Sequence, residues 1–123
     1  MGRKGFGDLL VWQKAKDLAV KIYHISDRTE LRKGFGLRDQ MRRSAISVAS
    51  NLAEGDERGT DREAIRFFYM AKGSVTELRT PFQIAYDVGY VERSTYDSVE
   101  VECVQLGKMI GSLIRARNQA TCL

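Results

Sequence analysis

Residues 40–63, QMRRSAISVASNLAEGDERGTDRE, contain the signals that decide the fold. Apolar side chains recur every three or four residues, which is the spacing of one helix face: Met41, Ala45, Val48 and Leu52. Glycine and charged residues then interrupt the pattern. Thr60 with Glu63 three residues later forms a capping box, which marks the start of a new helix. The stretch therefore predicts a helix, a short turn and a second helix.

The same periodicity continues on both sides and predicts helices at about 8–28, 36–57, 61–89 and 95–117. Asp8 and Ser94 are expected N-caps, and Gly89 is expected to end the third helix. Short connections between amphipathic helices favour antiparallel neighbours. We therefore predict an all-α fold, an up-down-up-down antiparallel four-helix bundle in which residues 1–123 form one domain with short flexible tails.

Each predicted helix has one apolar arc. On the first helix the arc includes Trp12 and Tyr23 beside Leu18 and Ile22, and on the third it includes Phe67 beside Phe68. Pro81 falls within the third helix, where it removes one hydrogen bond. A bend is expected there, because the apolar period continues to Tyr86. The alternative is that the helix ends at Thr80.

Polar residues line the margin of the core stripe on the second helix: Gln40, Ser44, Ser47, Asn51 and Glu54. Hydroxyl and amide groups at that margin permit close helix approach and hydrogen bonds between helices. We expect an interhelix polar ladder.

The outer faces of the second and third helices carry a further set of apolar and small residues with a few charges: Ile46, Ala49, Ala53, Arg66, Tyr69, Met70, Gly73 and Glu77. A glycine inside a helix costs about 1 kcal/mol relative to alanine, so Gly73 indicates close approach by another helix. Exposed apolar positions beside polar anchors are typical of protein interfaces. We predict a homo-oligomer interface, and the alternative is a set of scattered surface residues.

The net charge of +4 is unevenly distributed. Residues 1–43 hold 11 Lys/Arg against 5 Asp/Glu, whereas residues 44–123 hold 9 against 11. The candidate phosphate-binding residues are all in the basic part, together with Arg3 and Lys4: Lys14, Lys16, Lys21, Arg32, Lys33, Arg38, Arg42 and Arg43. Aromatic residues are expected in the core instead of beside these charges, which favours recognition of the RNA backbone or shape over base stacking.

Three segments resemble one protein family: DLLVWQKAKDLAVKIY from residue 8, GLRDQMRRSAISVASNLAEG from residue 36 and FFYMAKGSVTELRTPFQIAYDVGY from residue 67. They resemble the four-helix-bundle proteins encoded in intervening sequences of bacterial 23S rRNA genes. The resemblance covers about residues 6–117. It implies an up-down bundle that assembles into a ring, commonly a pentamer, without enzymatic activity. Such bundles are similar in fold to the accessory protein of diversity-generating retroelements, which engages nucleic acid. The loop TELRKGFG at residues 29–36 lacks the Phe-Pro pair usual in the family, and Pro81 is also unusual.

Catalytic and metal-binding patterns are weak. His24, the only histidine, has no glutamate three residues before it, as a di-metal bundle requires. Cys103 and Cys122 lack metal-ligand spacing, and Cys103 falls on an apolar stripe. Glu54 and Glu77 remain a possible acid–base pair. We predict no enzyme, no metal, no cofactor and no small-molecule substrate.

No apolar run approaches the roughly 20 residues that span a bilayer, so no membrane association is expected, and the protein is expected in the cytoplasm. These observations together predict a non-enzymatic oligomer that binds structured RNA or another nucleic acid. The alternative is a protein–protein scaffold that has no nucleic-acid role.

Overall fold

A computed structural model describes the backbone of residues 5–122 and the side chains of residues 5–119. A short 3₁₀ turn, η1 (Phe6–Asp8), precedes the helix α1 (Leu10–Arg28), and a second, η2 (Glu30–Lys33), leads into α2 (Phe35–Asp56). The remaining helices are α3 (Asp61–Asp87) and α4 (Arg93–Cys122). No strand occurs within the described residues. The prediction of an all-α fold with four helices is confirmed.

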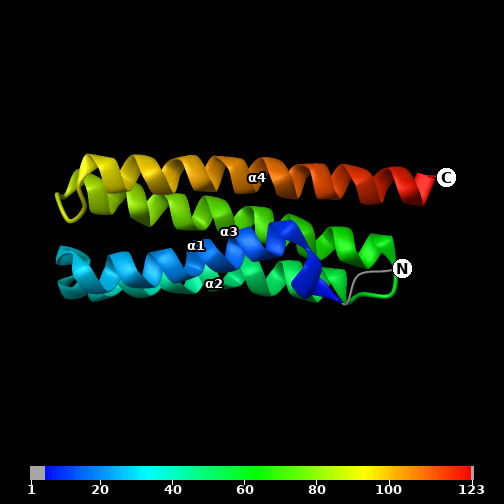
Figure 1. Ribbon diagram of the computed structural model, residues 1–123, viewed down its shortest axis with the longest axis horizontal. Helices are drawn as coiled ribbons and strands as arrows, with labels where there is room; N and C mark the ends of the chain where they lie inside the picture. Colours follow the sequence, from blue (N-terminus) through cyan, green and yellow to red (C-terminus); the bar gives the residue numbers. More distant parts are fainter. Residues whose placement is uncertain (1–4, 123) are drawn as a thin grey trace.

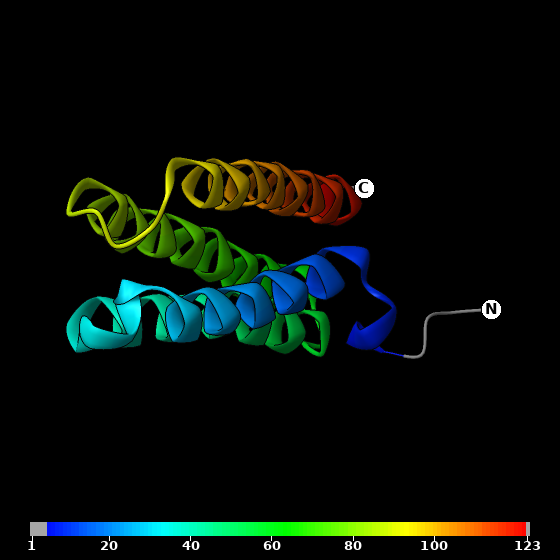
Figure 2. The same cartoon turned by 60° about the vertical axis from the view of Figure 1, so that its left-hand side comes forward.

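Each helix in Figure 1 runs in the direction opposite to the one before it. Figure 2 shows α3 and α4 as one pair lying against the pair formed by α1 and α2. The most extensive packing joins α2 to α3, and α1 touches α4 least of the neighbouring helices. The central hairpin α2–α3 therefore holds the two flanking helices.

The ends of α3 follow from its sequence. The Thr60 side chain accepts a hydrogen bond from the Glu63 backbone N–H at 3.2 Å, as predicted. At the other end Gly89 has φ of 84°, a left-handed conformation that favours glycine. Gly89 N–H donates to the Tyr86 carbonyl and Tyr90 N–H to the Ala85 carbonyl, the paired bonds of a Schellman motif.

Two predicted caps are wrong. Leu9 holds the N-cap position of α1 because residues 6–8 form a separate turn, in which Phe6 packs edge-on against Trp12. α4 begins at Arg93, so Ser94 lies inside the helix, and Asp97 instead accepts from the Arg93 guanidinium at 3.1 Å. α4 also extends to Cys122, beyond the predicted end at residue 117.

Pro81 lies inside an unbroken α3. The alternative prediction of a helix end at Thr80 is wrong. Leu78 before the proline and Phe82 and Ala85 after it are buried, so core packing on both sides of Pro81 holds the helix together despite the missing N–H.

Most predicted core residues are buried, but several of the aromatic ones are not. Tyr23 is 39% exposed, and Trp12 and Phe67 are half-buried. The Arg42 guanidinium lies 4.4 Å above the Tyr23 ring, and the Arg58 guanidinium lies 4.4 Å above Phe67. Tyr23 and Phe67 therefore lie at the edge of the core, where each ring contacts a cationic side chain.

One ion-pair cluster fixes the end of α4 to the α2–α3 turn. Arg117 donates to Asp61 at 2.9 Å and to Asp56 at 3.4 Å. The Asp56 side chain is only 3% exposed, so its charge depends on protein partners.

Candidate functional site

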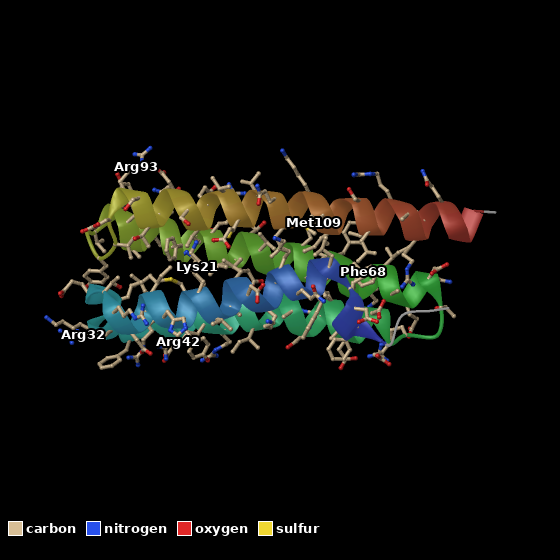
Figure 3. All side chains as sticks on the ribbon, viewed as in Figure 1. Lys21, Arg32, Arg42, Phe68, Arg93 and Met109 are labelled. Carbon is tan, nitrogen blue, oxygen red and sulfur yellow. The ribbon has the colours of Figure 1, made fainter. Side chains whose placement is uncertain are left out.

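The basic residues of the first half of the chain lie on α1, η2 and α2. Figure 3 shows Arg32 at the end of the bundle where α1 passes into α2, Arg42 along α2, and Lys21 toward α4. Arg3 and Lys4 lie outside the described residues. The remaining eight predicted phosphate ligands spread over the α1–α2 side and do not converge on one cavity.

Five of these eight cations have a carboxylate partner within the chain. The pairs are Lys16–Asp17, Lys21–Glu102, Lys33–Glu30, Arg38–Asp39 and Arg42–Asp27. Lys14, Arg32 and Arg43 are exposed and make no ion pair with any described carboxylate. Among the eight predicted residues, these three therefore have the charge most available to a phosphate.

Arg42 has a structural contact as well. Its Nε donates to Ser26 Oγ at 2.8 Å, and its Nη2 donates to Asp27 at 2.7 Å. Ser26 is fully buried on the inner face of α1. Arg42 thus holds α2 against α1. The sequence analysis did not predict this contact. Ser26 follows Ile22 by four residues and so falls on the apolar arc of α1, which is the pattern that could have indicated a buried hydroxyl in need of a partner.

Lys21 connects the flanking helices. Its ammonium group donates to Ser98 and to Glu102, both on α4. Since α1 and α4 otherwise touch little, Lys21 is a main polar link between them.

The polar residues of α2 divide into two groups. Ser47 and Ser74 hydroxyls lie 2.9 Å apart across the α2–α3 interface, and Asn51 Nδ2 donates to the Ser47 carbonyl at 2.9 Å. Ser44 is buried beside the core, whereas Gln40 and Glu54 are exposed. Glu54 accepts from Arg58 at 2.9 Å in the turn that follows α2, so the hydrogen bond between α2 and α3 comes from Ser47 in the middle of the ladder.

The predicted interface residues lie on two separate surfaces. Ile46, Ala49 and Ala53 line an apolar groove of about 520 Å³ between α1 and α2, together with Trp12 and Tyr23. We call this the α1–α2 groove. Ile46 is 44% exposed within it.

The predicted interface residues of α3 do not line the α1–α2 groove. Tyr69 and Met70 are 56% and 49% exposed, and Arg66, Gly73 and Glu77 are exposed on the same helix. A Cβ atom added at Gly73 meets nothing within 4 Å, so packing between the described helices does not explain the glycine.

The titratable groups form no reactive cluster among the described side chains. Burial raises the pKa of the Cys103 thiol to about 12, which keeps it neutral and poorly nucleophilic. Cys122 lies outside the described side chains. Glu54 and Glu77 are both exposed, and Glu54 is occupied by Arg58. No group of three potential metal-ligating side chains occurs in residues 5–119.

No helix within the described part of the chain is both long and apolar enough to cross a bilayer.

A sequence model of the family described as 23S rRNA-intervening sequence protein matches residues 7–112. The fold is similar to a crystal structure from Bacteroides thetaiotaomicron, described as a protein of unknown function from the S23 ribosomal protein family. The TM-score is 0.77 at 21% sequence identity, and the alignment covers 85% of this chain and 97% of that one. This likeness shows the fold. No curated protein matches the chain.

Proposed function

Because the chain belongs to the 23S rRNA-intervening sequence protein family, we propose that it binds structured RNA as a self-associating, non-enzymatic protein of the cytoplasm. The observation that carries this proposal is that Lys14, Arg32 and Arg43, on the basic side of the bundle, are exposed and form no ion pair with a described carboxylate. The proposed interface also includes the ion-paired cations Lys16, Lys21, Lys33, Arg38 and Arg42.

Phosphate binding is the mechanism that these residues favour. Lysine and arginine side chains neutralise phosphates and release counterions, so the affinity falls steeply as salt rises. Tyr23 already lies under the Arg42 guanidinium, which leaves one face of its ring covered. Contacts to the backbone and shape of RNA therefore fit this surface better than stacking of bases.

Self-association would increase the number of phosphate contacts that one assembly makes. Each copy contributes the same cations, and a ring such as a pentamer repeats them around its axis, so several weak contacts combine into one stronger interaction. The exposed Tyr69, Met70 and Gly73 on α3 and the α1–α2 groove supply two distinct apolar surfaces for a head-to-tail contact between copies.

A pulldown of total RNA across a salt series tests the proposal. The wild type is expected to retain RNA at low salt and release it as salt rises. A variant with Lys14→Gln, Arg32→Gln and Arg43→Gln is expected to retain less RNA. Its matched control, with Lys16→Gln, Lys33→Gln and Arg38→Gln, removes three charges that are already paired and is expected to lose less. Absence of RNA at low salt with the wild type contradicts the proposal.

A protein–protein scaffold is the second candidate function. It is favoured by the apolar α1–α2 groove and by the intrachain pairing of five predicted phosphate ligands. If the wild type retains no RNA while Ile46→Glu abolishes capture of a protein partner, the scaffold function replaces the RNA-binding proposal.

A further inference from the structure

A second groove runs between α3 and α4, on the helices that sequence reasoning had not connected with nucleic acid. Its volume is about 550 Å³, and its lining contains four cationic side chains and no carboxylate. We call it the α3–α4 groove. Its polar side chains come equally from the two helices: Lys72, Thr76 and Arg79 from α3, and Lys108, Ser112 and Arg115 from α4.

The two helices carry the same pattern. A lysine, then a hydroxyl residue four positions later, then an arginine three positions after that occur on α3 and again on α4. Residues at such spacings share one helix face, so each set points along the groove as one row. The antiparallel direction of α3 and α4 in Figure 1 places the two rows head to tail.

The register of the two rows is set by Arg79, which donates to Glu100 on α4. Arg115 lies 15 residues beyond Glu100, so the two arginines are roughly 20 Å apart at about 1.5 Å of rise per residue. By the same register Lys72 and Lys108 lie nearly level, in the middle of the groove. The positive charge therefore extends along the groove as a row, which suits a repeating anion better than a single one.

Most of this charge is unneutralised. Lys72, Lys108 and Arg115 make no ion pair with any described carboxylate, and Arg115 donates only to the Ser112 hydroxyl. Arg79 is the exception, because Glu100 pairs with it. On the α1–α2 side, by contrast, a carboxylate partners five of the eight predicted cations.

Glycines keep the groove open between the rows. Gly107 and Gly111 are part of the lining on α4. A Cβ atom added at Gly107 meets nothing within 4 Å, and one added at Gly111 meets only the Arg115 guanidinium at 3.5 Å. A bulky backbone group can therefore approach the helix surface between the lysines.

We propose that the α3–α4 groove binds the phosphodiester backbone of RNA and forms a second phosphate-binding surface beside the one on α1 and α2. This inference rests on the proposed function, since it names where the same ligand makes additional contacts. Lys72 and Lys108 bind neighbouring phosphates from opposite sides of the groove, and Arg115 binds a phosphate farther along. The Ser112 hydroxyl donates to a phosphate oxygen between Lys108 and Arg115, and the Thr76 hydroxyl donates to one on the Arg79 side of the lysines. The open floor at Gly107 admits the strand.

The test measures binding of a short fluorescently labelled RNA hairpin by anisotropy across a salt series. Gly107→Glu places a carboxylate into the open floor and is expected to weaken binding. Gln105→Glu adds the same charge at an exposed position of α4 outside the groove lining, and is expected to weaken binding much less. Circular dichroism of both variants checks that the helices remain intact.

A double variant, Lys72→Gln with Lys108→Gln, gives an independent measure. Each lost phosphate contact reduces the slope of log affinity against log salt by about 0.7–0.9, so the double variant is expected to flatten the slope by about 1.4–1.8. Lys14→Gln with Arg43→Gln makes the same charge change on the α1–α2 side for comparison.

The outcomes separate the two proposals. If the hairpin binds the wild type and the Lys14/Arg43 variant loses affinity while the α3–α4 groove variants do not, the groove inference is wrong and the proposed function stands. If the wild type does not bind the hairpin at any salt, both are wrong. If the groove variants lose affinity for a poly-glutamate peptide but keep that for the hairpin, the groove takes an acidic protein segment and the inference is again wrong.

Discussion

Gly55 on α2 and Phe68 on α3 pack so closely that a Cβ atom at position 55 would lie 2.6 Å from the ring atom Cε1 of Phe68. The same Cβ would lie 3.0 Å from the carbonyl oxygen of Ala64, which is backbone and cannot rotate away. Phe68 is fully buried, so the ring cannot move into solvent. Glycine at position 55 therefore sets how closely the ends of α2 and α3 approach.

Gly55→Ala is expected to lower the free energy of unfolding by about 1–3 kcal/mol, because overpacking a tight core forces the ring and helix apart. Gly107→Ala is the matched control. It also adds one methyl group inside a helix, but into open space, and is expected to raise stability by up to about 1 kcal/mol. Thermal and urea unfolding followed by circular dichroism measure both. Equal stability changes in the two variants would contradict the packing argument.

Arg117→Gln is expected to destabilise the protein by about 1–3 kcal/mol, because the nearly buried Asp56 loses a charged partner that satisfies it. Arg58→Gln breaks an exposed pair one helical turn apart with Glu54 and is expected to cost about 0.5 kcal/mol or less. The same unfolding measurements compare them. A cost for Arg58→Gln as large as that for Arg117→Gln would show that burial of Asp56 does not decide the effect.

The Cys103 thiol is expected to resist alkylation in the folded protein. Burial raises its pKa to about 12, so it stays neutral while an exposed thiol ionises near pH 8–9. A Cys122→Ser background isolates Cys103, and mass spectrometry follows iodoacetamide labelling at pH 8 with and without urea. Labelling is expected only in urea.

The same raised pKa links stability to pH. Because the folded Cys103 thiol stays protonated, the contribution of this protonated thiol to the free energy of unfolding is fully present below the pKa of the unfolded thiol. That contribution is lost as pH rises through the folded value near 12.

Gly73→Leu is expected to shift the protein to a smaller assembly in light scattering. Gly73 is exposed and open, so leucine fits the isolated chain but fills the space that a neighbouring copy would occupy. Gln105→Leu adds the same exposed leucine on α4 and serves as the control. A wild type that scatters as a monomer ends the case for self-association.

The sequence predicted the helices well because their periodicity is strong and their turns carry explicit signals. Thr60 and Gly89 performed the predicted roles, since a cap and a left-handed glycine depend only on nearby residues. Asp8 and Ser94 did not, because short 3₁₀ turns and side-chain pairs such as Arg93–Asp97 compete for the same helix starts. Local patterns do not resolve that competition.

The candidate surfaces were harder to predict because pairing of charges is a three-dimensional property. The sequence pattern predicts Lys21 as a surface cation on α1, but its partner Glu102 lies on α4 and is 81 residues away in the sequence. The sequence did not predict the α3–α4 groove, because its cations lie in a part of the chain that is acidic as a whole. Residues 44–123 carry a net negative charge, and only the packing of α3 on α4 gathers Lys72, Lys108 and Arg115 away from the acidic residues.

The narrow seam between α1 and α4 governs how the bundle comes apart. We expect either flanking helix to detach while the hairpin of α2 and α3 keeps its own hydrophobic interface, so that opening proceeds stepwise from the outside inward. Backbone amides of the central hairpin are then the last to exchange with deuterium, and the chain keeps a folded remnant from which the whole domain reassembles.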